Sequence, residues 1–130
     1  MAHAWRWVDK RALLLLHDEI LAEHGGLPGL RDEGLLDSAL ARPLNLAAYG
    51  DPDGCELASS YCVGLAKNHP FVDGNKRAAF LALGLFLYLN EQRLTATQAE
   101  ATLAVLAVAA SEWDEATLTA WLRTHTAPRV

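Results

Sequence analysis

Cysteine is scarce in this sequence, which contains only Cys55 and Cys62 among 130 residues. In a helix, residues seven positions apart have Cα atoms about 10 Å from each other, too far for a disulfide. Since both lie in one expected helix, a disulfide between them within that helix is ruled out, and we expect both thiols to be reduced, as in cytosolic proteins.

Basic charge and long apolar runs are also lacking. The formal net charge is -5, which disfavours a nucleic-acid binder that works through a basic surface. The longest apolar run, residues 78–89, is shorter than a membrane span. The first seven residues contain no apolar stretch of a secretory signal. We therefore expect a cytoplasmic protein that makes no direct contact with nucleic acid or membrane.

The composition is that of a folded chain, with 52% hydrophobic and 21% charged residues. This length is sufficient for one hydrophobic core and too short for two ordinary ones. We therefore expect a single domain over residues 1–130.

Helical spacing of apolar residues and capping signals predict helices along most of the sequence. The expected helices cover residues 9–23, 32–42, 53–68, 73–89 and 97–109, and a last one begins at Ser111 or Asp114 and continues to 123. Their predicted caps are Asp9, Asp32, Asp53 with Glu56, and Thr97 with Glu100. Pro43 should end the second helix.

No segment alternates as a strand would, so the fold class is all-α. Residues 78–89 are apolar on every side of a helix, which predicts burial at the centre of a compact bundle.

Residues 69–77, with the sequence His-Pro-Phe-Val-Asp-Gly-Asn-Lys-Arg, join the end of one expected helix to the start of the apolar one. The first amides of a helix lack intrahelical acceptors and bind anions readily. Gly74 permits close approach of the backbone, and Lys76 and Arg77 add cationic donors. The segment therefore predicts a phosphate site at a helix N-terminus.

Two further side chains in this segment suggest catalysis. Asp73 offers the hard oxygen ligand that Mg²⁺ bridging nucleotide phosphates requires. The imidazole of His69 can take a proton from a hydroxyl near neutral pH. Proline at position 70 disfavours right-handed α backbone at His69, and Phe71 is expected to anchor the loop in the core.

Each of these residues alone has a simpler interpretation. His69 and Asp73 can be a surface pair or a capping arrangement, Lys76 and Arg77 a solvated face, and Phe71 an ordinary core residue. Their joint occurrence within nine residues between two helices favours a functional site. A metal hydrolase built on His69 and Asp73 would lack the further ligands that a catalytic metal usually takes.

Residues 69–77 resemble the motif of the Fic/Doc superfamily, and Lys76 resembles its Doc (death-on-curing) branch. Leu16-His17-Asp18 and residues 25–30 resemble the N-terminal signature of that family. The Fic pattern has glycine in place of Lys76 and a second arginine in place of Phe80. After Gln92 only a helical pattern supports the resemblance.

The resemblance implies a Fic/Doc-type bundle and a protein Ser/Thr kinase that uses ATP and Mg²⁺. In Doc-like toxins the nucleotide presents its γ-phosphate to the acceptor hydroxyl, whereas Fic enzymes transfer AMP. The implied roles are His69 as base, Asp73 as magnesium ligand, a phosphate cradle of Gly74, Asn75, Lys76 and Arg77, and a peripheral nucleotide contact at Lys67. For His17 and Asp18 a helix-packing pair is favoured over a catalytic role.

The resemblance also implies a toxin whose substrate is elongation factor Tu, so that translation and growth stop. Ser111 and Glu115 match only the first half of the inhibitory motif of some Fic proteins, because Ala116 follows. A separate antitoxin is therefore expected, with a helical tail in an apolar groove. Two alternatives stay open: a Fic-type nucleotidyl (AMP) transferase, and a catalytically inactive antitoxin-binding module.

Overall fold

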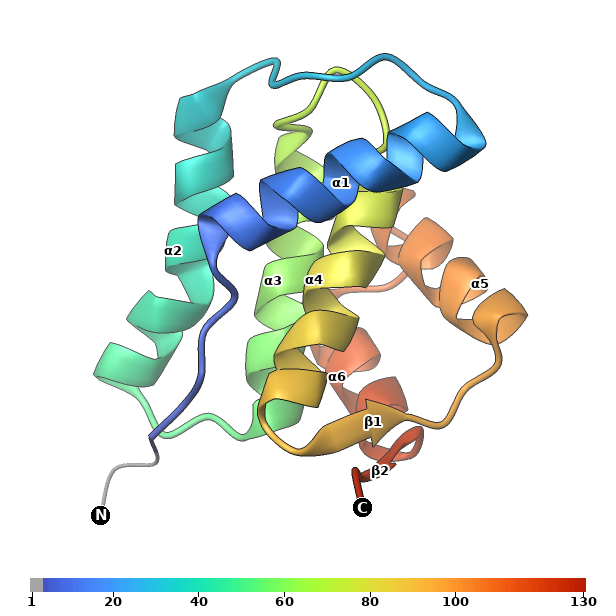
Figure 1. Ribbon diagram of the computed structural model, residues 1–130. Coiled ribbons are helices and arrows are strands. Elements are labelled where there is room, and N and C mark those ends of the chain that lie inside the picture. Colours follow the sequence, from blue (N-terminus) through green and yellow to red (C-terminus); the bar gives the residue numbers. More distant parts are fainter. Residues whose placement is uncertain (1–3) are drawn as a thin grey trace.

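The computed structural model describes residues 4–130, so the first three residues of the opening segment lie outside the described part of the chain. Within it the fold is all-α, as predicted. The elements are α1 (Lys10–His24), α2 (Glu33–Tyr49), α3 (Gly54–Asn68), α4 (Asn75–Leu89), β1 (Gln92–Leu94), α5 (Gln98–Ala109), α6 (Glu115–Arg123) and β2 (Thr126–Pro128). Figure 1 shows α1 lying across the bundle, with the α3–α4 loop and the α1–α2 segment at one end.

Local capping chemistry explains where most of these helices begin. The side chains of Asp9, Asp32, Asp53, Thr97 and Asp114 each accept a hydrogen bond from an amide in the first turn of α1, α2, α3, α5 and α6. In α3 and α5 the partner glutamates, Glu56 and Glu100, complete capping boxes. These starts confirm the sequence predictions, and Asp114 rather than Ser111 begins the last helix.

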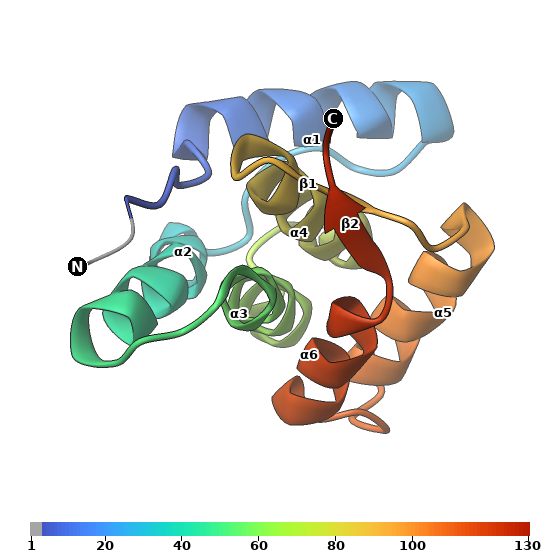
Figure 2. The ribbon, with the colours of Figure 1, turned by 90° about the horizontal axis from the view of Figure 1, so that it is seen from below.

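The buried central helix is α3. Most of its residues are buried, and α2, α4 and α6 surround it when the bundle is seen from below (Figure 2). Small residues on α3, such as Ala58, Ser59 and Gly64, allow this close packing. The buried residues of α3 are Leu57, Ala58, Ser59, Ser60, Tyr61, Cys62, Gly64, Leu65 and Ala66.

The expectation that residues 78–89 form the central helix was wrong. One face of α4 packs on the core through residues such as Ala79, Ala82 and Phe86, which are fully buried. The opposite face is only partly covered, and it carries Phe80, Leu81, Gly84 and Leu85. The apolar residues on one side of α4 therefore belong to the core, and those on the other side line a groove. No helix in residues 4–130 is long and apolar enough to cross a membrane.

Pro43 lies inside α2 and does not end it. Proline in a helix interior removes one backbone hydrogen bond and costs about 3 kcal/mol. Pro43 is buried, however, and Leu46 and Ala47 beyond it pack against the core. Tertiary packing therefore carries the helix past the proline, which the local rule could not anticipate.

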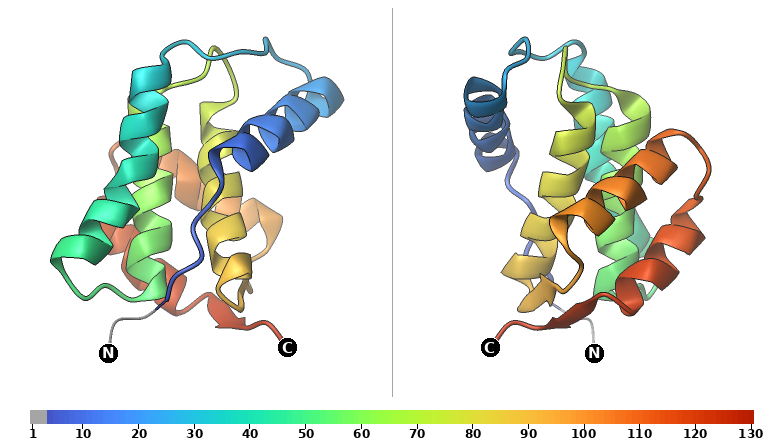
Figure 3. Two further views of the ribbon diagram at one scale, coloured as in Figure 1. Left: turned by 60° about the vertical axis from the view of Figure 1, so that its left-hand side comes forward. Right: turned by 90° about the vertical axis from the view of Figure 1, so that its right-hand side faces the viewer.

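Two three-residue strands were not predicted. β1 pairs antiparallel with β2, and Arg93 lies opposite Ala127. The pairing brings the C-terminal segment back to the end of α4, as both views of Figure 3 show. Strands this short contain no alternating pattern that a sequence search would detect.

The state of the two cysteines agrees with the sequence prediction. Both cysteines are free, and burial raises the pKa of the Cys62 thiol to about 12, which makes it unreactive. The four tryptophans, Trp5, Trp7, Trp113 and Trp121, are partly buried against the core.

Candidate functional site

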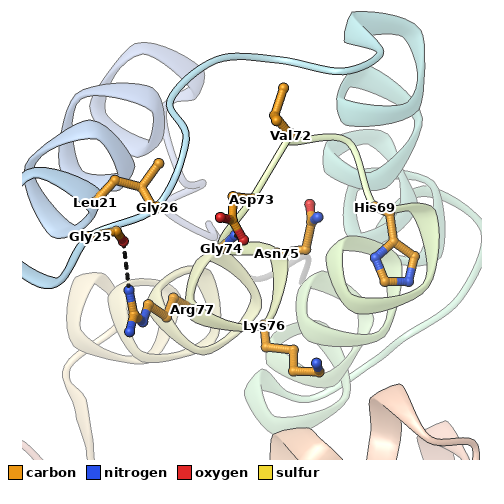
Figure 4. Close-up of a pocket in the computed structure, with 10 residues that line it drawn as sticks. All are labelled: Leu21, Gly25, Gly26, His69, Val72, Asp73, Gly74, Asn75, Lys76 and Arg77. Atoms are coloured by element: carbon orange, nitrogen blue, oxygen red, sulfur yellow. Dashed lines mark hydrogen bonds between the residues drawn. The ribbon is translucent and has the colours of Figure 1, made fainter.

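A cleft of about 550 Å³ opens where the α3–α4 loop meets the C-terminal end of α1. Figure 4 shows His69 on one side of this cleft and Arg77 on the other, with Asp73 and Gly74 between them. The lining residues are Leu21, Gly25, Gly26, His69, Val72, Asp73, Gly74, Asn75, Lys76 and Arg77. The predicted segment is therefore exposed in a cavity and is not part of a continuous helix.

Left-handed backbone at two residues gives the loop its shape. His69 ends α3 with φ 50° and ψ 55°, so it leaves the right-handed α region as the following proline predicts. Gly74 precedes α4 with φ 73° and ψ 26°, a conformation that glycine adopts without strain. The chain therefore reverses between the two helices within a few residues.

The start of α4 differs from the other helix starts because no side chain caps it. The amides of residues 75, 76 and 77 donate to no acceptor in residues 4–130, and the first helical bond there is from Ala78 N to Gly74 O at 2.9 Å. These amides form the positive end of the helix dipole. They form a site ready for an anion such as a phosphate.

Two side chains fix the loop on the protein. Phe71 is buried and stacks on the buried ring of His17, with 3.8 Å between the ring centroids. The Asn75 amide group bonds Phe71 twice, because its Nδ2 donates to Phe71 O at 3.0 Å and its Oδ1 accepts from Phe71 N at 2.9 Å. Asn75 was expected to hold phosphate. Since its side chain is engaged in the loop, only its backbone amide is available for that role.

Asp73 is held at the mouth of the cleft by backbone groups. Its Oδ1 accepts from Gly74 N at 3.0 Å, and its Oδ2 accepts from Leu27 N at 3.3 Å. A carboxylate has about four acceptor positions, so both oxygens retain capacity for a cation. No group of three potential ligands among His, Cys, Asp and Glu occurs in residues 4–130. One carboxylate fits Mg²⁺, which takes its other ligands from phosphates and water.

The cationic residues of the motif divide into two groups. Lys76 and Arg77 are exposed and line the cleft, and Arg77 Nη1 donates to Gly25 O at 3.4 Å. Lys67 does not line it, and its Nζ donates to Ser111 Oγ in the α5–α6 turn. Lys67 precedes His69 by two residues, which is about 200° around a helix. The geometry therefore gives Lys67 no place in the cleft.

The structure brings His69, Asp73, Gly74, Lys76 and Arg77 together around one cavity. His17 and Arg31, which act on this loop from distant segments, were not assigned to the site from the sequence. His17 Nε2 lies 2.9 Å from Asp73 O and its ring is buried, which agrees with the packing interpretation for His17, whereas Asp18 is exposed and does not share in it. Only the signature around residues 16–18 pointed to it.

A model of the Fic/DOC family matches residues 7–87, which end within α4. The chain is similar to "Protein kinase doc" of Escherichia phage P1, with 36% identity over 86 residues that make up 65% of this chain and 68% of that protein. It is also similar to "Toxin Doc" of Mycolicibacterium smegmatis, with 44% identity over 75 residues. That match covers 55% of this chain and 57% of the relative.

Proposed function

The chain belongs to the Fic/DOC family, and on that premise we propose that it is a Doc-type toxin and a protein Ser/Thr kinase. Its phosphate donor is ATP, and its acceptor is a hydroxyl of a translation factor, elongation factor Tu. The observation that carries the proposal is the uncapped N-terminus of α4 in a cleft shared by His69, Asp73 and Arg77. The relatives named a kinase and a toxin give it support.

In the proposed reaction the imidazole of His69 takes the proton of the acceptor hydroxyl. The hydroxyl oxygen then bonds to the γ-phosphorus, and the bond from that phosphorus to the β–γ bridging oxygen breaks. ADP leaves, the protein acceptor carries the phosphoryl group, and the proton stays on His69. The free amides of residues 75–77 and the cations of Lys76 and Arg77 would hold the phosphates and stabilise the charge that develops.

Magnesium fits this site through Asp73, which would hold it together with phosphate oxygens. When bound, Mg²⁺ neutralises phosphate charge. Asp73 itself is oriented by the amides of Gly74 and Leu27, so its carboxylate is in place before the nucleotide arrives.

The position of Phe80 favours transfer of the terminal phosphate. Phe80 occupies the place where the Fic pattern carries a second arginine, and its ring lines the neighbouring apolar groove. Lys76 stands where that pattern has glycine. Both differences remove features that AMP transfer uses in Fic enzymes.

Labelled ATP tests the proposed reaction. Incubation with elongation factor Tu, Mg²⁺ and γ-labelled ATP should label the factor, and α-labelled ATP should not. Label from the α-position alone would instead identify a nucleotidyl transferase. Absence of both labels, together with no binding of magnesium ATP by the folded protein, would identify an inactive binding module.

Nucleotide binding can be measured apart from transfer. Magnesium ATP at 100 times its dissociation constant should raise the free energy of unfolding by roughly 2.7 kcal/mol, which a thermal shift measurement detects. Lys76→Ala should weaken this binding, because Lys76 lines the cleft. Lys67→Ala is the matched control and should bind as the original chain does, since Lys67 contacts Ser111 instead. An equal loss of magnesium ATP binding in both variants would contradict this placement of the phosphates.

We also propose that a separate antitoxin binds the chain through a helical tail. A second cavity of about 710 Å³ lies between α1, α4 and α5, and the uncovered face of α4 forms its floor. Its apolar residues Phe80, Leu81 and Leu85 suit the apolar face of a helix. Lys76 and Arg77 line both cavities, so an acidic group on the tail could pair with them and obstruct the phosphate site.

Growth assays test the partner. The chain expressed alone should stop growth, and co-expression with the adjacent reading frame should restore it. Leu85→Glu should keep the toxicity and lose the rescue, because a charge in the groove opposes an apolar helix. Leu103→Glu is the control, since Leu103 is exposed on α5 and does not line the groove. Normal growth with the folded chain alone would contradict the need for an antitoxin.

A further inference from the structure

Arg31 joins the segment before α2 to the end of α3. Its Nε donates to His69 O at 2.8 Å, and its Nη2 donates to Asn68 O at 3.0 Å. These are carbonyls at the C-terminus of a helix, where intrahelical donors are missing and the dipole favours a cation. The planar guanidinium satisfies two of them at once.

The backbone of Arg31 strengthens the same junction. Arg31 N donates to Pro70 O at 2.7 Å, and Asp32 N donates to the same oxygen at 3.0 Å. Three consecutive carbonyls, those of Asn68, His69 and Pro70, are therefore held by two adjacent residues. The segment before α2 thus binds the backbone at the end of α3, where the chain turns toward α4.

The backbone conformation of His69 needs such contacts to persist. A histidine with φ 50° is in a sparsely populated region that persists only when surrounding contacts hold it. The His69 imidazole has no hydrogen-bond partner in residues 4–130. The ring is therefore placed by the backbone from which it projects, and the Arg31 side chain bonds two carbonyls of that backbone.

We propose that Arg31 is a positioning residue, whose two side-chain hydrogen bonds hold the left-handed turn that directs the His69 imidazole into the cleft. The kinetic consequence rests on the proposed function, in which His69 is the general base. Arg31 itself touches neither the phosphates nor the acceptor.

Kinetics of Arg31→Gln and Arg31→Lys test the proposal. Misplacement of a catalytic group by about 1 Å costs up to about 100-fold in rate, so we expect kcat to fall by about 10- to 100-fold. Affinity for magnesium ATP should stay within about twofold, because the amides of α4 are untouched. Lysine should not rescue, since it lacks the planar fork of donors.

Arg123→Gln is a matched control, because Arg123 of α6 contacts the opposite end of α3 from the end that Arg31 contacts. Arg123 pairs with Asp53 and Glu56 at the start of α3, at 3.0 and 3.3 Å, and it is also half exposed. The control should keep the full kcat. Equal losses of kcat in the Arg123 and Arg31 variants would show a general effect on α3 and overturn the proposal.

An NMR measurement separates this proposal from the proposed function. In the original chain and in Arg123→Gln, the amides of Asn68 and His69 should be rigid, with order parameters of about 0.85. In Arg31→Gln they should fall below about 0.6. That loosening with no kinase activity in the original chain would leave the positioning role standing and refute the kinase. Rigid amides, or an unchanged kcat in an active enzyme, would refute the role of Arg31.

Discussion

Replacing His69 with alanine should lower the rate of phosphate transfer by about 10² to 10⁴-fold, which is the usual contribution of a general base. Binding of magnesium ATP should change little, because the groups that would donate hydrogen bonds to the phosphates are the amides of α4, Lys76 and Arg77. His69 is exposed at the edge of the cleft, so its truncation leaves no buried void. Single-turnover transfer rates and thermal shifts measure the two effects separately.

His125→Ala serves as the control for this loss. His125 lies between α6 and β2 in the sequence, and Figure 1 shows these two elements at the end of the bundle opposite the α3–α4 loop. Its removal should leave the transfer rate unchanged. Retained activity in His69→Ala would mean that another group accepts the proton, and the assignment of His69 as base would be wrong.

Gly74→Ala should destabilise the fold by about 1 to 3 kcal/mol and weaken nucleotide binding. Gly74 has φ 73°, and an added Cβ would lie 3.0 Å from His17 Nε2 and 3.1 Å from Leu21 Cδ2. Both neighbours are buried, so the loop must move to relieve the contact. Movement there displaces the free amides at the start of α4.

Gly84→Ala is the matched substitution in the same helix and should have the opposite sign. A Cβ at Gly84 meets nothing within 4 Å, and alanine is favoured over glycine in a helix interior by about 1 kcal/mol. Chemical denaturation of both variants gives the comparison. Equal stability changes at the two positions would contradict the strain assigned to the loop.

Helix starts were predictable because they depend on neighbours within a few residues. The Asp53 and Glu56 capping box and the Asp9 cap are complete in the local sequence, and the structure has both. The nine-residue motif was equally local, since its residues share one turn and one helix start. Short-range chemistry is sufficient for predictions of this kind.

Features set by tertiary packing were not predictable in the same way. Continuation of α2 past Pro43 depends on burial of the turn beyond it. The central place of α3 depends on small residues such as Gly64, which lets α2 approach, since a Cβ there would lie 3.2 Å from Ala39. The apolar composition of α4 could not reveal which face stays uncovered.

Within the site, the supporting residues are distant in sequence from the loop that they hold. His17 lies 56 positions before Asp73, and Arg31 lies 38 before His69. No spacing rule connects such pairs. The residues of the motif also have different roles that the sequence does not reveal. The Asn75 side chain bonds the backbone of Phe71, while Lys76 and Arg77 line the cleft.

A crystal structure with Mg²⁺ and a non-hydrolysable ATP analogue would test the central claim most directly. We predict the phosphates against the amides of residues 75–77, the cation on the Asp73 carboxylate, and the terminal phosphate as the one closest to the His69 ring. A triphosphate bound outside this cleft, or one that turns its α-phosphate to His69, would contradict the proposed transfer.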